Sequence, residues 1–182
     1  MAKPNRKMKI KREFRSFLKA KQCCHDGSKG FYGLYPLSAR CLNKCDLKKH
    51  DGWILLDTTP LGRFPILDTR EFLDLLICSV PDLKPPTPKQ MERILQFIQE
   101  HEKTLISCIG AHGRTGTVLA IWLYLHEPEG DPILKVRERY CKEAVESREQ
   151  ALFIYDFLKL EPNHKLLSEL DLIEPWPKMK WW

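Results

Sequence analysis

A cysteine and an arginine stand six positions apart in residues 105–117, which read Leu-Ile-Ser-Cys-Ile-Gly-Ala-His-Gly-Arg-Thr-Gly-Thr. The run before Cys108 is typical of a buried strand, and the run after Arg114 is typical of a helix. Backbone N–H groups of such a loop and helix start converge on one anion. The same field stabilises a thiolate, the nucleophilic form of cysteine, and a guanidinium binds two phosphate oxygens. The segment therefore predicts a phosphate site with a nucleophile.

The small residues of this loop fit the same interpretation. Gly110, Gly113 and Gly116 leave room for a phosphate and a helix start to approach the backbone. Thr115 is placed to donate a hydrogen bond to the thiolate. The alternative is a chance pair in an ordinary strand-to-helix turn, which the matching context on both sides disfavours. The predicted phosphate-binding residues are Ile109, Gly110, Ala111, His112, Gly113 and Arg114, with a plain surface histidine as the alternative for His112.

Short apolar runs alternate with helical patterns along the chain. The clearest helix start is Thr87-Pro88-Lys89-Gln90, with Thr87 as N-cap and Gln90 closing a capping box. Strands alternating with helices predict an α/β fold, with a central, mostly parallel sheet flanked by helices. The expected strands are residues 31–37, 53–56, 72–80 and 104–107, and the expected helices are residues 10–20, 38–49, 87–102, 114–126, 131–142 and 147–160.

Charge divides the 182 residues unevenly. The net charge is +6, yet nine basic residues and one acidic residue precede residue 22, so the remaining chain is slightly acidic. We expect a basic N-terminal arm over residues 1–22, a catalytic domain over residues 23–165 and a C-terminal tail over residues 166–182. The arm is either a solvated end or a contact for RNA or another polyanion.

Apolar runs and cysteines bear on the compartment. The longest strongly apolar run is about residues 118–125, far below the roughly 20 residues that cross a bilayer, so no transmembrane segment is expected. The N-terminus has no apolar signal region, which predicts a cytoplasmic protein with its seven cysteines reduced. One group of cysteines and a histidine has two interpretations, as ordinary core and turn residues or as the ligands of a zinc ion. Its members are Cys23, Cys24, His25, Cys41 and Cys45.

Residues 108–116 resemble the Cys-x5-Arg-Ser/Thr-Gly loop of cysteine-based protein tyrosine phosphatases, most of all the small dual-specificity members. Val80-Pro81-Asp82 resembles the general-acid loop of that family, and it precedes the cysteine as the family requires. Residues 131–157 resemble the two helices that follow in the dual-specificity members, with Gln150 near the water-positioning segment. The resemblance covers about residues 31–160, and no segment is long enough for the tyrosine-recognition loop of the larger enzymes.

The resemblance implies a two-step hydrolysis of phosphate monoesters on proteins, at tyrosine and also at serine or threonine. Cys108 attacks phosphorus while Arg114 and the loop amides stabilise the equatorial oxygens. Asp82 protonates the leaving oxygen, and Gln150 orients the water that then hydrolyses the phosphocysteine. The reaction needs neither a metal ion nor a cofactor. Asp57 and Asp74 are the alternative acids.

Two residues depart from the family pattern. Ser107 stands where the family usually has histidine, and Ala111 stands where it usually has glycine. If that loop position needs a positive φ, alanine costs about 1 kcal/mol of backbone strain. Neither change removes a reacting group, so we expect an active enzyme. The alternatives are an RNA 5′-phosphatase of the same fold and a module that binds phosphate without turnover; a phosphoinositide enzyme is disfavoured because residues 109–112 include no lysine or arginine.

Overall fold

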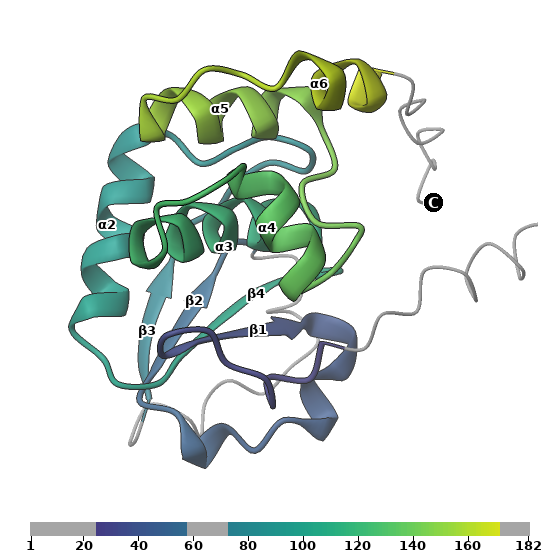
Figure 1. The fold of residues 1–182 in the computed structure, drawn as a ribbon. Coiled ribbons are helices and arrows are strands. Elements are labelled where there is room, and N and C mark those ends of the chain that lie inside the picture. Colours follow the sequence, from purple (N-terminus) through teal and green to yellow (C-terminus); the bar gives the residue numbers. More distant parts are fainter. Residues whose placement is uncertain (1–24, 58–72, 172–182) are drawn as a thin grey trace, which may run out of the picture.

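The computed structural model describes residues 25–57 and 73–171, and in these residues it has the predicted α/β fold (Figure 1). One four-stranded sheet has the order β1-β4-β2-β3, and every pairing is parallel. The strands are β1 (Leu34–Ser38), β2 (Gly52–Leu55), β3 (Asp74–Ile77) and β4 (Thr104–Cys108). The helices are α2 (Pro88–Gln99), α3 (Gly113–His126), α4 (Pro132–Arg139), α5 (Arg148–Leu158) and α6 (His164–Asp171), with short 3-10 helices η1 (Ala39–Lys44) and η2 (Leu47–Lys49).

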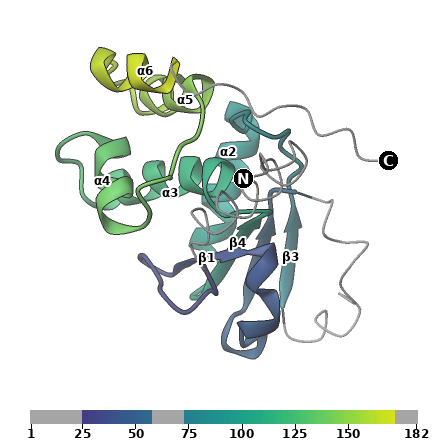
Figure 2. The ribbon, with the colours of Figure 1, turned by 90° about the vertical axis from the view of Figure 1, so that its right-hand side faces the viewer.

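Alternate residues of each strand face opposite sides of the sheet. Ile54 and Ile106 belong to the large core that the α-helices cover, and Figure 2 shows these helices on one side of the sheet. Trp53 and Leu105 belong to a smaller core on the other face, against which residues of η1 and η2 pack. The period of two in a strand therefore separates the two cores.

Helix α3 lies at the centre of the large core. Its residues from Gly113 to Leu123 are all buried, and it packs against α4, α5 and β4. The apolar run of residues 118–125 is therefore largely core. Across residues 25–57 and 73–171, no helix combines the length and apolar character that crossing a bilayer would require.

Helix α6 was not expected from the sequence. Leu166, Leu167 and Leu170 are buried in the large core, and the helix packs against α5. Residues 166–171 of the predicted tail therefore belong to the packed structure of the domain.

The predicted helix over residues 38–49 is wrong in type. Ser38 is the N-cap of η1, and its hydroxyl accepts from the Arg40 N–H, but two short 3-10 helices stand in place of the α-helix, with extended residues between them. This connection must cross from β1 to β2, which lies beyond β4. A 3-10 helix rises about 2.0 Å per residue, against 1.5 Å in an α-helix, so it spans this distance with fewer residues.

The remaining expected elements are present with shifted ends. The capping box of α2 is formed, with reciprocal bonds between Thr87 and Gln90. Strand β3 is shorter than residues 72–80, although the Cys78 and Val80 N–H groups still bond to carbonyls beside β2. The predicted helix over residues 10–20 lies outside the described residues.

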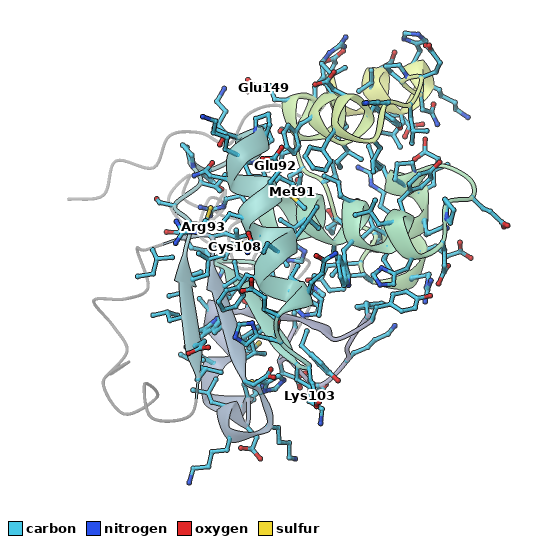
Figure 3. All side chains as sticks on the ribbon, turned by 90° about the vertical axis from the view of Figure 1, so that its left-hand side faces the viewer. Met91, Glu92, Arg93, Lys103, Cys108 and Glu149 are labelled. Atoms are coloured by element: carbon cyan, nitrogen blue, oxygen red, sulfur yellow. The ribbon has the colours of Figure 1, made fainter. Side chains whose placement is uncertain are left out.

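The carboxyl ends of three parallel strands meet at one edge of the sheet. Cys108 ends β4, Asp57 follows β2, and Val80 and Asp82 follow β3. Figure 3 labels Lys103 and Cys108 at opposite ends of β4, with Cys108 at the end toward α5 and Glu149. Ligands of open α/β sheets bind at this edge.

Candidate active site

Cys108 is the last residue of β4 and is 4% exposed. The Thr115 hydroxyl donates to its Sγ at 3.2 Å. Since α3 begins at Gly113, the first turn of a long helix lies next to the sulfur. A hydroxyl donor and a helix N-terminus both favour a negatively charged sulfur.

Arg114 is buried and held by three oxygen atoms. Its Nη1 donates to Asp57 Oδ2 at 2.8 Å and to the Val80 carbonyl at 3.0 Å, and its Nη2 lies 3.3 Å from Asp82 Oδ1. The Asp57 side chain is only 8% exposed. Asp57, an alternative acid in the sequence analysis, is thus the buried counter-ion of the arginine.

The other alternative acid lies at the wrong end of the sheet. Asp74 begins β3, and its carboxylate is 3.1 Å from His101 Nε2. Asp82 has the opposite character, with a side chain that is 77% exposed beside Arg114. Among the three candidate acids, Asp82 is the one that combines access to solvent with proximity to Arg114.

The segment of Asp82, Leu83 and Lys84, called the acid loop below, is held by contacts with the start of α5. The Ser147 hydroxyl donates to the Leu83 carbonyl at 2.6 Å, and Lys84 Nζ lies 2.5 Å from a Glu149 carboxylate oxygen. Leu83 has φ 60°, which makes a sharp turn directly after Asp82. The N-terminus of α5 and the acid loop therefore form one structural unit.

Gln150 is fully buried within this unit. Its Oε1 accepts from the N–H groups of Glu146 and Ser147, and its Nε2 donates to the Lys84 carbonyl at 3.5 Å. The side chain therefore caps α5 and supports the acid loop. Its role in orienting water stays a prediction.

The loop that follows Cys108, predicted to bind phosphate, has the backbone conformation on which the departure at Ala111 depends. Ala111 has φ 59°, so the position does need a positive φ, and its carbonyl accepts from the Tyr140 hydroxyl. Ile109, which follows Cys108 in the chain, exposes 37% of its surface. His112 is buried against Cys141 and His25, so the interpretation of His112 as a plain surface histidine is wrong.

Glu146 is a site residue that the sequence analysis missed. Its Oε2 accepts from the Gly113 N–H at 2.9 Å, although that amide was assigned to phosphate. A Cβ on Gly113 would lie 2.5 Å from this oxygen, and one on Gly116 would lie 3.0 Å from Ala144. Because these two glycines have no side chains, residues 144–146, just before α5, can pack against the start of α3. The signal available in the sequence was that Glu146 carries a carboxylate in a segment that packs against the loop after Cys108.

We expect Glu146→Gln to lower the KM for phosphate monoesters about tenfold, because the carboxylate charge opposes a bound phosphate. Two unit charges about 4 Å apart near a protein surface interact by about 4 kcal/mol, and relief of only about 1.4 kcal/mol of this repulsion gives a tenfold change. Glutamine keeps an acceptor for the Gly113 N–H. Steady-state kinetics and inhibition by inorganic phosphate measure the effect, with the exposed Glu161→Gln as control. A higher KM in Glu146→Gln would mean that the carboxylate assists binding.

Ser107 has a partner of its own. The buried Trp53 Nε1–H donates to the Ser107 hydroxyl at 2.8 Å, from β2 to β4. Ser107 is thus hydrogen-bonded to the neighbouring strand, on the face of the sheet opposite the helices.

Ser107→Ala is expected to lower the free energy of unfolding by about 1–3 kcal/mol, because the indole N–H is left buried and unpaired. Urea denaturation measures this loss. The double variant Ser107→Ala/Trp53→Phe removes the orphaned donor, so its loss should be smaller than the sum of the single losses. Additive losses would count against the hydrogen bond.

Asp57→Ala is expected to cost about 3–5 kcal/mol of stability, because it leaves Arg114 as a buried charge without its main partner. Asp57→Asn, which keeps an acceptor oxygen, should lose less. Urea denaturation compares both with Asp46→Ala, which removes an exposed ion pair with Lys49 and should change little. Equal stability of Asp57→Ala and Asp46→Ala would contradict the buried pair.

The described members of the alternative zinc group, His25, Cys41 and Cys45, do not come together as a cluster. Cys23 and Cys24 lie outside the described residues. Within residues 25–57 and 73–171, the one cluster of three candidate ligands joins His25 to His112 and Cys141, without Cys41 or Cys45. The five described cysteines form no disulfide bond with one another.

The comparisons with known proteins agree with this geometry. The family model described as PTP-SAK, "Swiss Army Knife protein, DSP-PTPase phosphatase domain", matches residues 58–153. The uncharacterized protein MJ0215 of Methanocaldococcus jannaschii is 37% identical over 145 residues, which are 77% of this chain and 91% of the relative. The uncharacterized protein MJECL20 of the same organism is 37% identical over 143 residues, 76% of this chain and 97% of that one.

Solved structures with the same fold are phosphatases. The crystal structure of Tk-PTP in its active form has a TM-score of 0.57 and 25% identity, covering 72% of this chain and 90% of that one. DUSP15 has a TM-score of 0.56 and 18% identity, covering 79% and 94%. The chain therefore belongs to the cysteine-based protein tyrosine phosphatase superfamily and has a phosphatase domain of the dual-specificity type.

Proposed function

We propose that this protein hydrolyses phosphate monoesters on proteins through a phosphocysteine. The observation that carries the proposal is the convergence of Cys108, Arg114 and Asp82 at the carboxyl edge of the sheet, with Arg114 Nη2 3.3 Å from the Asp82 carboxylate. This set supplies a nucleophile, an anion-binding side chain and an acid. It needs neither a metal ion nor a cofactor.

In the first step the Cys108 thiolate attacks phosphorus in line with the leaving oxygen. The Arg114 guanidinium and the loop amides bind the equatorial oxygens, where charge develops. Phosphate thereby replaces Glu146 as the acceptor of the Gly113 N–H. Asp82 gives its proton to the leaving alcohol or phenol, so no free alkoxide forms.

In the second step water attacks the phosphocysteine. Asp82, now ionised, takes a proton from that water, and the thiolate leaves with the Thr115 hydroxyl as its donor. Gln150 orients the water in this proposal, which requires its amide to exchange the bond to the Lys84 carbonyl for one to water.

Phosphotyrosine on a protein is the substrate best supported here. The exposed Ile109 side chain, directly after the nucleophile, offers an apolar contact to an aromatic ring. The basic arm lies outside the described residues, so an RNA 5′-phosphatase remains the alternative. The cytoplasmic location also stays a prediction.

The test compares substrates for the wild-type chain without added metal. We expect turnover of p-nitrophenyl phosphate and a phosphotyrosine peptide, with a covalent phosphoenzyme trapped by rapid acid quench and located by mass spectrometry at Cys108. Phosphoserine peptides and 5′-triphosphorylated RNA are the competing substrates. Tight phosphopeptide binding without phosphate release would overturn the enzyme in favour of a binding module, and faster turnover of RNA would replace the protein substrate.

A further inference from the structure

A cluster of two histidines and a cysteine lies behind the phosphate loop, with His112 and Cys141 buried and His25 half-buried. One ligand atom each from His25, His112 and Cys141 lies within 4.8 Å of the others. The Cys141 Sγ is 3.4 Å from His112 Nδ1, and the rings of His25 and His112 meet edge to face with centroids 5.1 Å apart. The three residues come from the segment before β1, the phosphate loop and the connection after α4.

The backbone holds His25 at this place. Its carbonyl accepts from the Ser38 N–H at 2.7 Å, and the next residue, Asp26, forms an antiparallel bridge with Leu37. The imidazole packs on the ring of Tyr140 at a centroid distance of 4.4 Å. Tyr140 in turn donates to the Ala111 carbonyl. The histidine is therefore fixed against the loop by contacts at both its backbone and its ring.

The His25 ring carries an unused lone pair. Its Nε2 is buried, and no hydrogen-bond partner for it is found in the part of the chain that the structure describes. A neutral imidazole with a buried, unpartnered nitrogen is the form that binds a metal ion.

We propose that His25, His112 and Cys141 bind one zinc ion, which ties the segment before β1 to the phosphate loop. Two imidazole nitrogens and a thiolate are ligands that zinc prefers. With Zn–S and Zn–N bonds of about 2.3 Å and 2.0–2.1 Å, tetrahedral geometry puts the donor atoms about 3.4–3.6 Å apart. The Cys141–His112 sulfur–nitrogen separation of 3.4 Å meets this requirement. Since all the donor atoms lie within 4.8 Å of one another, no separation must close by more than about 1.4 Å.

An open cavity gives the ion a route and room for a fourth ligand. His25 and Cys141 are both in the lining of a cavity of about 410 Å³. Water can complete the coordination from this side. The Cys141 proton is released to solvent when the thiolate binds zinc, so the step changes protonation and no oxidation state.

The position of His112 gives the ion a consequence for the catalytic loop. The His112 carbonyl accepts from the Gly116 N–H at 2.8 Å in the first turn of α3, and its side chain is a zinc ligand. Zinc therefore restrains the loop between Cys108 and Arg114 from behind. Because the ligands are far apart in sequence, binding also stabilises the folded chain.

The experiment uses the full chain, stripped with a chelator and titrated with Zn²⁺ by calorimetry. We expect one equivalent to bind with a rise in Tm. Even loss of a group that only supports a ligand costs 10–100-fold in affinity, so His25→Ala and Cys141→Ser should each weaken binding at least about tenfold. His164→Ala and Cys45→Ser are controls from outside the cluster and should bind as wild type does. Turnover of p-nitrophenyl phosphate by the stripped variants reports that they are folded.

Cobalt gives an independent readout. Co²⁺ in the same site should show a thiolate-to-metal charge-transfer band, which disappears in Cys141→Ser and remains in Cys45→Ser. His25→Gln serves as a second variant if His25→Ala does not fold. Zinc binding that is absent in the wild type, or unchanged in both His25→Gln and Cys141→Ser, would overturn the site, whatever the substrate of the enzyme is.

Discussion

Cys108→Ser is expected to abolish hydrolysis of p-nitrophenyl phosphate, with a loss of about 10⁴-fold or more, as for other enzymes that lose their nucleophile. The hydroxyl of serine is not ionised near neutral pH, whereas the sulfur lies beside the Thr115 hydroxyl and the first turn of α3. Initial rates and the phosphoenzyme signal after acid quench measure the loss.

The same variant should still bind substrate, because Arg114 and the loop amides remain. Its affinity for a phosphotyrosine peptide is expected to stay within a few-fold of the KM of the wild type. Cys78→Ala is the matched control, since this cysteine is buried in the same core at the end of β3. A Cys108→Ser variant that retains turnover, or a Cys78→Ala variant that loses it while folded, would move the nucleophile elsewhere.

Asp82→Asn is expected to lower kcat about 10²–10⁴-fold for substrates with poor leaving groups, the usual contribution of a general acid. Asparagine keeps the size and a hydrogen bond to Arg114 but has no proton to give. The side chain is exposed, so the lost ion pair itself contributes little to stability.

A series of aryl phosphates separates this role from mere positioning. The loss should be large for phenyl phosphate and small for p-nitrophenyl phosphate, whose leaving group departs without a proton. Asp74→Asn, at the opposite end of β3 beside His101, should leave both rates unchanged. An equal loss for every leaving group would assign Asp82 to orienting Arg114.

The sequence by itself determined the parts of the site that are contiguous in the chain. The strand before Cys108 and the helix after Arg114 follow from residue types within one short segment. The positive φ of Ala111 is a finding of the structure, since alanine itself disfavours it. Covalent geometry fixes the relative positions of such residues, so their spacing is informative. The capping box of Thr87 and the parallel sheet followed for the same reason, from local hydrogen bonding and apolar periodicity.

The tertiary structure alone decided which distant residues meet. Asp57 pairs with Arg114 because the ends of β2 and β4 are neighbours, and Trp53 reaches Ser107 through the same strand pairing. Apolar periodicity shows that a strand is buried, but it does not encode the order of strands in the sheet. The choice of 3-10 helices between β1 and β2 likewise depended on the distance to be crossed.

The contacts on the far sides of the phosphate loop have the same origin. Glu146 reaches the Gly113 N–H because α5 packs against α3, and His25 reaches His112 because its segment pairs with the end of β1. No spacing in the chain predicts these meetings, since the intervening segments are long and their paths are set by packing. Residue types within one segment thus predicted the loop from Cys108 to Arg114, whereas long-range packing decided which residues surround and restrain it.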